Sequence, residues 1–287
     1  MTTHPITFGI VTAQEQVTFG WLVETWRAAE AAGFDSGWLF DHFYALRGEE
    51  AGVTLEASTV LAGLALKTER LELGVLVYGN THRLPTILAK EMATIDSLSG
   101  GRAILGLGAG WNAPEHAAYG IPFPSAGDRV SMLEEALQII ALLSTQERTT
   151  FKGRFYTLEN APFNPKPVRG RFPIVIGGSK PRMLGVIGRH ADMWDGGGDP
   201  AAIRAGLATI AEHAVAAGRD AGAVAASKNL GAEPLASAAA FGAAVRDYAA
   251  AGVRQFLFRL PTEDGERDRA IAVAAAAMPG LRAELAG

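Results

Sequence analysis

The chain has 287 residues, of which 48% are apolar and 20% are charged, with a formal net charge of -4 and a pI near 5.9. The acidic balance argues against nucleic acid and anionic membrane surfaces as partners. The chain contains no cysteine, which excludes disulfides and thiol chemistry. The sequence begins without the features of a signal peptide, and no run approaches about 20 apolar residues. We therefore expect a cytoplasmic protein that acts on a small molecule.

Short apolar runs typical of buried strands alternate along the chain with longer segments of helical periodicity. The predicted strands are Ile6–Val11, Trp38–Phe40, Leu71–Val77, Ala103–Leu107, Ile174–Ile176, Ala191–Asp195, Val224–Asn229 and Gln255–Leu260. The predicted helices are Val17–Ala32, Leu55–Leu66, Pro85–Ser99, Ser125–Ser144, Pro181–Arg189, Pro200–Ala217, Ala236–Ala251 and Arg267–Leu285. Eight strands and eight helices in alternation predict a single (β/α)8 barrel domain over residues 1–287.

The main alternative is an open, doubly wound sheet that binds a dinucleotide. Such a sheet carries a Gly-x-Gly-x-x-Gly turn after its first strand, whereas here that strand runs into the sequence TAQE. In the glycine-rich run that starts at Gly106, Trp111 stands where the third glycine belongs. The chain also lacks a Gly-x-x-x-x-Gly-Lys-Ser/Thr phosphate loop. The barrel is therefore the favoured interpretation.

Residues 145–172, between the fourth and fifth predicted strands, break the alternation. The segment is rich in proline, glycine and aromatic residues, which is typical of an irregular excursion. A linker between two domains is the alternative, but the strand and helix patterns resume directly afterwards. We expect the excursion to cover one end of the barrel, and we expect it and the loop Trp111–Pro124 to act as lids.

Polar and glycine-rich turns follow the third and fourth predicted strands, at the end of such a barrel where ligands bind. The first turn extends from Tyr78 to Arg83 and the second from Gly108 to Asn112. Glycine at these positions lets a flat ligand approach the backbone closely. Tight turns with incidental polar residues are the alternative interpretation.

Three of the six histidines fall near the same rim: His42 after the second strand, His82 after the third and His116 past the fourth. An imidazole at a barrel mouth suits proton transfer, because its ordinary pKa lies near neutrality. A structural histidine that is hydrogen-bonded to a loop is the alternative. Metal binding is not expected, because the chain lacks the His-x-His pair that metal-hydrolase barrels commonly carry on the first strand.

The turn Gly177-Gly178-Ser179 precedes a predicted helix and indicates an anion site. Free backbone N–H groups, the helix dipole and a serine hydroxyl converge at such a position. Lys180 and Arg182 add positive charge beside it. The signal is weak by itself, because the usual phosphate site of such a barrel follows strands seven and eight.

Several segments from about residue 6 to about residue 198 match motifs that are specific in combination. They are GFDSGWLFDHF, LGVLVYGNTHRLPTILAKEMATIDSLSGGR, LGLGAGWNAPEHAAYGIPFP, FNPKPV, PIVIGGSKPRML and HADMWD. Together they resemble the luciferase-like monooxygenase superfamily and, more narrowly, its branch that uses the deazaflavin coenzyme F420. The chain beyond residue 198 is compatible with this resemblance but does not carry it.

The resemblance implies a bacterial-luciferase-like (β/α)8 barrel, usually a homodimer, with the deazaflavin ring in the barrel mouth. Asp41 and His42 match the family's Asp-His pair, which contacts the cofactor and supplies the catalytic histidine in the sugar-phosphate dehydrogenases of this branch. Relatives also carry a non-prolyl cis peptide, which would fall at Leu76–Val77 as a bulge behind the ring. The implied cofactor contacts are Asp41, Leu76, Val77, Gly79, Asn80, Gly108, Ala109, Asn112, Ile176, Gly177, Gly178 and Ser179.

One position departs from the pattern of the sugar-phosphate dehydrogenases. Those enzymes place an acidic residue just after the fourth strand, where this chain has Trp111. The acid–base pair is then incomplete, which puts oxidation of a sugar phosphate in doubt. Glu15 and Glu115 could substitute for the missing carboxylate.

The resulting hypothesis is an oxidoreductase that transfers a hydride between F420 and an unidentified organic substrate. His42 would donate or accept a proton, and Tyr44, Tyr78 and Trp111 would give the pocket an aromatic lining. An FMN-dependent monooxygenase that uses reduced flavin and O2 is one alternative, and a flavin-binding barrel without turnover is another. The Asp-His pair favours the deazaflavin without excluding FMN.

Overall fold

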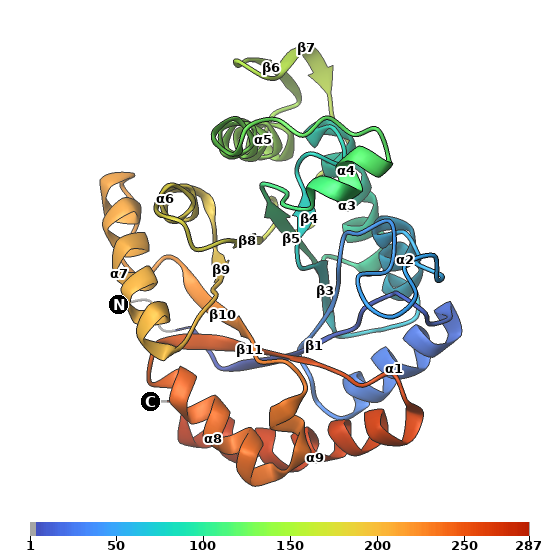
Figure 1. The fold of residues 1–287 in the computed structure, drawn as a ribbon. Helices are drawn as coiled ribbons and strands as arrows, with labels where there is room; N and C mark the ends of the chain where they lie inside the picture. The colour runs from blue at the N-terminus through green and yellow to red at the C-terminus, as the bar shows by residue number, and fades with distance from the viewer. Residues whose placement is uncertain (1–3, 287) are drawn as a thin grey trace.

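The computed structural model describes residues 4–286, in which eight parallel strands close into a barrel (Figure 1). The barrel strands are β1 (Thr7–Val11), β2 (Ser36–Leu39), β3 (Glu72–Val75), β5 (Ala103–Gly108), β8 (Ile174–Gly177), β9 (Met193–Asp195), β10 (Ala225–Asn229) and β11 (Val253–Arg259). Each strand pairs with the next in this order, and β11 pairs with β1 to close the ring. The predicted (β/α)8 fold is confirmed.

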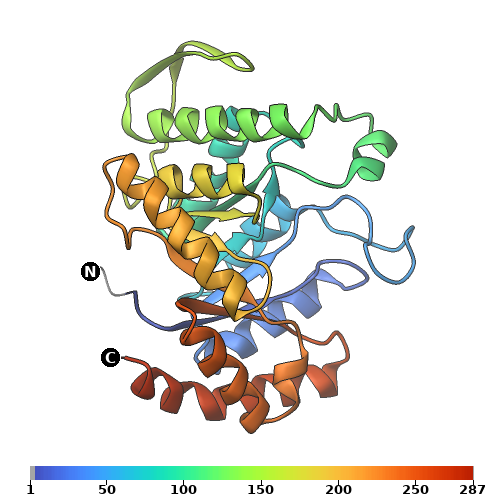
Figure 2. The same ribbon diagram turned by 60° about the vertical axis from the view of Figure 1, so that its left-hand side comes forward.

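Helices surround the barrel and alternate with its strands along the chain (Figures 1 and 2). They are α1 (Phe19–Ala31), α2 (Ala57–Ala65), α3 (Pro85–Ser99), α5 (Ala126–Thr145), α6 (Pro181–His190), α7 (Pro200–Ala216), α8 (Ala238–Ala249) and α9 (Asp264–Glu284). Every predicted strand and helix is present, with ends displaced by at most three residues.

Several elements were not predicted, because the shortest cannot show a hydrophobic period and the two hairpin strands are largely polar and exposed. They are β4 (Tyr78–Gly79), α4 (Ala113–Ala118), the antiparallel pair β6 (Arg148–Lys152) and β7 (Thr157–Pro162), and the 3-10 helix η1 (Glu233–Ala236). Of these, α4 lies inside the loop that was predicted as a lid, and it carries a residue of the site.

The inside of the barrel is filled with large apolar side chains, so the barrel has no open channel. The cluster contains Val11, Trp38, Ile104, Val175 and Leu257, each at most 5% exposed. The opposite faces of the same strands pack against the helices in a second, larger core. Because the interior is filled, a ligand cannot enter the barrel itself, and the mouth is the place where such barrels bind their ligands.

The excursion at residues 145–172 does not cover the barrel mouth, so the prediction that it forms a lid is wrong. Its hairpin, β6 and β7, lies beyond α5 on the side away from the barrel (Figure 1). The side chain of Glu135 on α5 accepts hydrogen bonds from the backbone N–H groups of Arg154, Phe155 and Tyr156, at 2.7, 3.0 and 3.2 Å. These bonds hold the tip of the hairpin on the surface of α5.

Arg102, the last residue of the SGGR motif, forms hydrogen bonds that connect the end of α2, the segment before β3 and the end of α3. Its guanidinium donates to the carbonyl oxygens of Ala65, Thr68 and Leu71 at 2.6, 2.9 and 2.7 Å, and Nε donates to the Ser99 carbonyl at 2.9 Å. Arg102 thereby satisfies carbonyl groups at the end of α2 and before β3, which the helix and sheet leave without partners.

We expect Arg102→Ala to lower the free energy of unfolding by about 2–4 kcal/mol, because several carbonyl groups lose their donor at once. Urea denaturation followed by circular dichroism measures the change. The matched control is Arg204→Ala, at an exposed position of α7, which we expect to shift stability by less than about 0.5 kcal/mol. Equal stability of the two variants would contradict this role for Arg102.

Candidate active site

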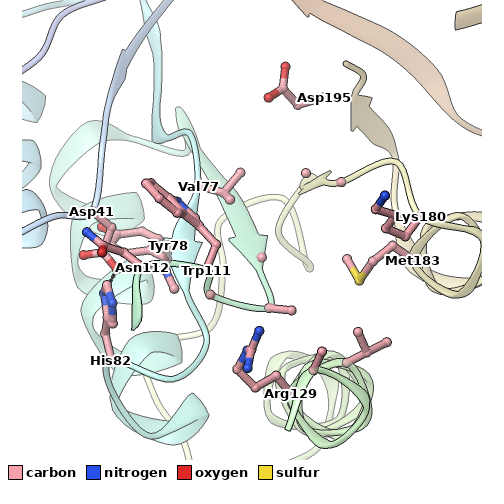
Figure 3. A pocket seen from close by; sticks show the side chains of 18 of the residues that line it. Asp41, Val77, Tyr78, His82, Trp111, Asn112, Arg129, Lys180, Met183 and Asp195 are labelled. Carbon is pink, nitrogen blue, oxygen red and sulfur yellow. Dashed lines mark hydrogen bonds and ion pairs between the residues drawn. The ribbon is translucent and has the colours of Figure 1, made fainter. Parts of the chain in front are cut away.

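A cavity of about 640 Å³ opens at the barrel mouth (Figure 3). Its size falls within the range of small-molecule sites. The predicted site residues that line it are Asp41, His42, Leu76, Val77, Tyr78, Gly79, Gly108, Ala109, Trp111, Asn112, Gly177, Gly178 and Ser179. The sequence therefore predicted where the cavity lies. Among the described residues, none of the excursion 145–172 belongs to its lining.

Three predicted contacts do not belong to the cavity lining. Ile176 is fully buried in the core between the barrel and the helices. Asn80 is also buried, and its side-chain amide donates to the Tyr156 hydroxyl of the hairpin at 3.3 Å. The Tyr44 hydroxyl accepts a hydrogen bond from the Asn112 amide at 3.1 Å. A motif match gives the position of a residue but not the direction of its side chain, which alternates along a strand.

Tyr78 and Trp111, the other two predicted aromatic residues, differ in what they offer to a ligand. The Tyr78 ring is fully buried, and its hydroxyl accepts a hydrogen bond from Ser58 at 3.2 Å. Burial raises the pKa of this hydroxyl, so Tyr78 stays neutral and structural. Trp111 is exposed at the cavity edge, where it can contact a ligand.

The peptide bond between Leu76 and Val77 is cis, as predicted. The side chain of Val77 lies in the middle of the cavity lining (Figure 3). A Cβ atom on Gly108 would lie 2.8 Å from a Val77 methyl group, which is too close, so glycine is needed at position 108. A Cβ on Gly177 would lie 3.5 Å from the same methyl group, which is an ordinary contact distance.

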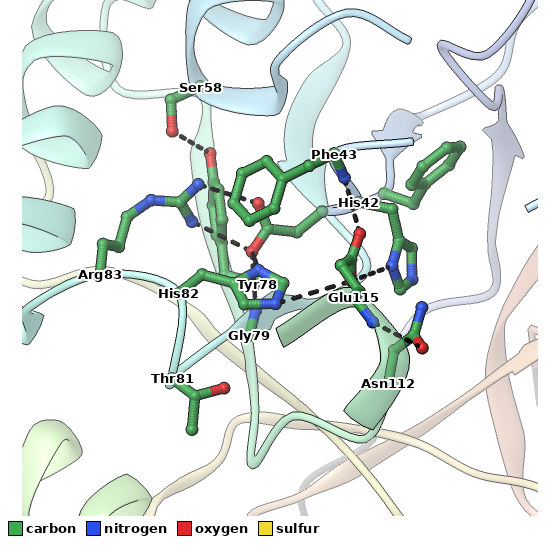
Figure 4. A network of polar contacts seen from close by, with 12 residues as sticks. His42, Phe43, Ser58, Tyr78, Gly79, Thr81, His82, Arg83, Asn112 and Glu115 are labelled. Atoms are coloured by element: carbon green, nitrogen blue, oxygen red, sulfur yellow. Dashed lines mark hydrogen bonds and ion pairs between the residues drawn. The ribbon is translucent and has the colours of Figure 1, made fainter. Parts of the chain in front are cut away.

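His42 is held by a buried carboxylate from α4, Glu115. The Glu115 Oε2 accepts a hydrogen bond from His42 Nδ1 at 2.9 Å, and its Oε1 accepts one from the backbone N–H of Phe43 at 2.7 Å (Figure 4). Glu115 is fully buried, whereas the His42 side chain is 13% exposed and lines the cavity. The carboxylate fixes a proton on Nδ1, which leaves Nε2 available to a ligand.

Glu15, the other candidate for the missing acid, has a different role. Its carboxylate accepts a hydrogen bond from the backbone N–H of Leu46 at 2.7 Å, and Glu15 does not belong to the cavity lining. The centroid of the His42 ring lies 5.3 Å from that of Phe40 and 5.6 Å from that of Trp111. Trp111 therefore packs against His42, and the acidic partner of His42 is Glu115 of α4.

Asp41 is an anchor for the turn after β3. It is buried, and its carboxylate accepts hydrogen bonds from the backbone N–H of Gly79 and from Nδ1 of His82, both at 2.8 Å, and from the guanidinium of Arg83 at 2.9 Å. Burial alone would raise the pKa of Asp41, but the hydrogen bonds from His82 and Arg83 hold it below its ordinary value. Asp41 thus stays charged and fixed, which makes it a positioning residue rather than the predicted catalytic one.

The two histidines beside this anchor are structural. His82 lies between the two carboxylates, with Nδ1 on Asp41 and Nε2 3.8 Å from Glu115 Oε2 (Figure 4). His116 shares its Nδ1 proton with the Asn112 carbonyl at 2.7 Å, and its Nε2 accepts from the Thr81 hydroxyl at 2.7 Å. Burial lowers the pKa of His116, which keeps it neutral.

The predicted anion site lies at the opposite end of the cavity, where α6 begins. No side chain caps α6, so the N–H groups of its first turn are open to a ligand. The turn before it is held from β9, because Trp194 Nε1 donates to the Gly178 carbonyl at 2.7 Å. Ser179 and Lys180 line the cavity beside this helix end.

Arg182, which the sequence placed beside the anion site, is held by α5, and Arg129 lines the same cavity. Arg182 donates to the carbonyl of Gly127 at 2.8 Å and to the Ser131 hydroxyl at 2.6 Å, so its guanidinium is bound to α5. Arg129 was not predicted, but it lines the cavity and lies over the Phe123 ring at 3.8 Å. Its buried Nε has no hydrogen-bond partner among the described residues. Nη1 of Arg129 donates to the Pro124 carbonyl at 2.5 Å, so within residues 4–286 this guanidinium is held in part and keeps Nε as a donor without a partner.

Asp195 is a further site residue that the sequence pattern did not single out. It ends β9, pairs with Gly177 of β8, and lines the cavity. Its Oδ1 is buried and has no hydrogen-bond partner in the described part of the chain. Burial raises the pKa of Asp195 to about 7, and the positive charge of Lys228 offsets only part of this effect.

We expect Asp195→Asn to stabilise the protein increasingly from about pH 4 to about pH 7. The unfolded chain loses this proton near pH 4 and the folded chain only near pH 7, so wild-type stability falls over that interval by about 1.4 kcal/mol per pH unit. The variant lacks this loss. Urea denaturation of both proteins at pH 5, 6, 7 and 8 measures the difference, which should level off above pH 7. A difference that does not change with pH would contradict the raised pKa.

Two findings limit the kinds of site in this molecule. Within residues 4–286, no group of three or more histidine, aspartate or glutamate side chains is placed to hold a metal ion. None of the helices in the same range is long and apolar enough to cross a membrane.

Comparison with known proteins identifies the family. The model of the luciferase-like monooxygenase family matches residues 3–283. The chain belongs to this family. A solved F420-dependent secondary alcohol dehydrogenase, in complex with an F420–acetone adduct, superposes on this luciferase-like chain with a TM-score of 0.85. The two are 20% identical, and the match covers 96% of this chain and 99% of the other. At that identity the similarity shows a common fold.

Two curated relatives of this luciferase-like chain are more similar in sequence. An F420-dependent glucose-6-phosphate dehydrogenase of Kineococcus radiotolerans is 35% identical over 190 residues, which cover 66% of this chain and 56% of the relative. A phthiodiolone/phenolphthiodiolone dimycocerosates ketoreductase of Mycobacterium kansasii is 34% identical over 196 residues, which cover 61% and 52%. The chain spans about half the length of the curated relatives it matches.

Proposed function

We propose that this luciferase-like chain is an oxidoreductase that transfers a hydride between coenzyme F420 and an organic substrate. The observation that carries the proposal is the pair of His42 and Glu115 at the edge of the glycine-lined cavity. One imidazole nitrogen is fixed by a buried carboxylate and the other is available to a ligand. The relative from Kineococcus, whose name specifies F420, supports the choice of coenzyme.

The residues of the cavity fit a flat ring with an anionic side chain. Gly108, Gly177 and Gly178 present backbone rather than side chains to the space beside Val77. At the other end, the start of α6, Lys180 and the unpartnered Nε of Arg129 offer positive charge. When bound, the deazaflavin would supply a carbon that carries a hydride and reacts poorly with oxygen.

The protein's own residues would position the reactants and handle one proton. His42 would give or take that proton at Nε2, and Glu115 would hold the ring in place and stabilise its charged form. Asp41 would keep the Gly79 turn in place beside the ring. The rings of Phe40 and Trp111, next to the histidine, would exclude water from it.

The first test is a fluorescence titration of the purified protein with oxidised F420 and, separately, with FMN. We expect a Kd for F420 in the micromolar range or below, and binding of FMN at least about tenfold weaker, because the cationic end of the cavity suits a longer anionic chain. Tighter binding of FMN would replace the proposal with oxygen chemistry. Failure of both to bind would show that the glycine turns serve the fold alone.

Substitution of His42 and Glu115 tests the chemistry. With a carbonyl substrate found by screening against reduced F420, we expect His42→Asn to lower kcat by about 10²- to 10⁴-fold and Glu115→Gln by about 10- to 100-fold. The Kd for F420 should change less than about threefold in both. Glu15→Gln is the matched control, because Glu15 is also a buried carboxylate that accepts from a backbone N–H, but away from the cavity. A rate that survives in His42→Asn would contradict the mechanism.

A further inference from the structure

Three polar side chains on neighbouring strands share an unusual feature: each has a buried atom without a hydrogen-bond partner among residues 4–286. The atoms are Oδ1 of Asp195 on β9, Oγ of Ser227 on β10 and Oε1 of Gln255 on β11. Ser227 pairs in register with both Asp195 and Gln255, so the three side chains emerge on the same face of the barrel wall. Buried polar atoms without partners are rare in native proteins, and each needs an explanation.

Among these three residues, Asp195 lines the cavity. Figure 3 shows it on a wall of its own, away from Arg129 and Lys180 and away from the cluster around Asp41. Its neighbour in register on β8 is Gly177, which has no side chain and also lines the cavity. The unsatisfied oxygen of Asp195 therefore belongs to a group that a ligand in the cavity can reach.

The charges around Asp195 restrict what that ligand can be. The cations of the cavity lining, Arg129, Lys180 and Arg182, come from α5 and from the start of α6. Lys228 is close enough to act on Asp195, but it lies over the Tyr248 ring at 5.5 Å and does not line the cavity. A carboxyl group on this wall repels phosphate and carboxylate groups, and it accepts a hydrogen bond from a hydroxyl group.

We propose that Asp195 determines substrate specificity by forming a hydrogen bond with the hydroxyl or carbonyl oxygen of an uncharged organic molecule, an alcohol or its ketone. Because its pKa is raised to about 7, the carboxyl group accepts from the alcohol when ionised and donates to the ketone when protonated. That this molecule is the substrate rests on the proposed function. Its hydrogen bond with Asp195 does not, because Asp195 lines the cavity whatever reaction takes place there.

Binding of two matched probes to the protein without coenzyme tests the inference. Cyclohexanol carries an uncharged hydroxyl and cyclohexyl phosphate carries an anion on the same ring, and ligand-observed NMR gives a Kd for each. The cationic end of the same cavity can hold the phosphate, so we expect Asp195→Ala not to weaken the binding of cyclohexyl phosphate. We expect Asp195→Ala to weaken cyclohexanol binding by about 5- to 30-fold. Asp195→Asn preserves the shape and should have a smaller effect.

Two controls separate this inference from the proposed function. Asp247→Asn, at an exposed position of α8, should leave the binding of cyclohexanol unchanged, and all variants should keep the Kd for F420 within about threefold of wild type. Cyclohexanol that does not bind, or that binds Asp195→Ala as tightly as wild type, would overturn the role of Asp195 even where F420 binds. Dependence on Asp195 in a protein that fails to bind F420 would uphold it and overturn the proposed function alone.

Discussion

The site depends on one buried carboxylate, that of Glu115. A carboxylate without solvent is costly unless donors surround it, and here both oxygens are engaged, Oε2 by His42 and Oε1 by the backbone of Phe43. These bonds fix the loop after β2 against α4 and select the proton position on the imidazole. Removing the carboxylate would therefore free the His42 ring and the loop after β2, and it would no longer fix which ring nitrogen carries the proton.

The three acids of the cavity lining, Asp41, Glu115 and Asp195, differ in how completely the protein satisfies their hydrogen bonds, and this difference indicates their roles. Asp41 is fully engaged by His82, Arg83 and a backbone N–H, and its pKa is lowered. Glu115 is engaged by the histidine that it positions. Asp195 is the exception, with an unpartnered oxygen and a raised pKa. A carboxyl group beside a cavity that lacks a hydrogen-bond partner in the protein is available to a ligand. A carboxyl group whose hydrogen bonds are all made within the protein serves to hold the site in place.

The sequence predicted the barrel and the location of its cavity because both follow from local patterns. Strand and helix periods give the elements, and the glycines at positions 108 and 177 mark where backbone faces a ligand. It could not choose between Glu15 and Glu115, because α4 is too short to show a period and Glu115 lies 73 residues from His42. It also missed Asp195. What distinguishes this residue is a carboxyl oxygen without a hydrogen-bond partner among the described residues, and this can be seen only once the neighbouring strands are in place.

The tryptophan at position 111 then has a consequence for substrate choice. In the related sugar-phosphate dehydrogenases the sequence pattern places an acid there, whereas in this chain the acid partner of His42 comes from α4 and binds Nδ1 from within the protein. The position after the fourth strand is thereby freed for an aromatic ring at the cavity edge. Trp111 follows one barrel strand and Asp195 ends another, so in the proposed mechanism His42 keeps its carboxylate partner while these two residues offer the substrate an aromatic ring and a carboxyl group with an unpartnered oxygen. Such a surface favours an uncharged alcohol or ketone over a phosphorylated sugar.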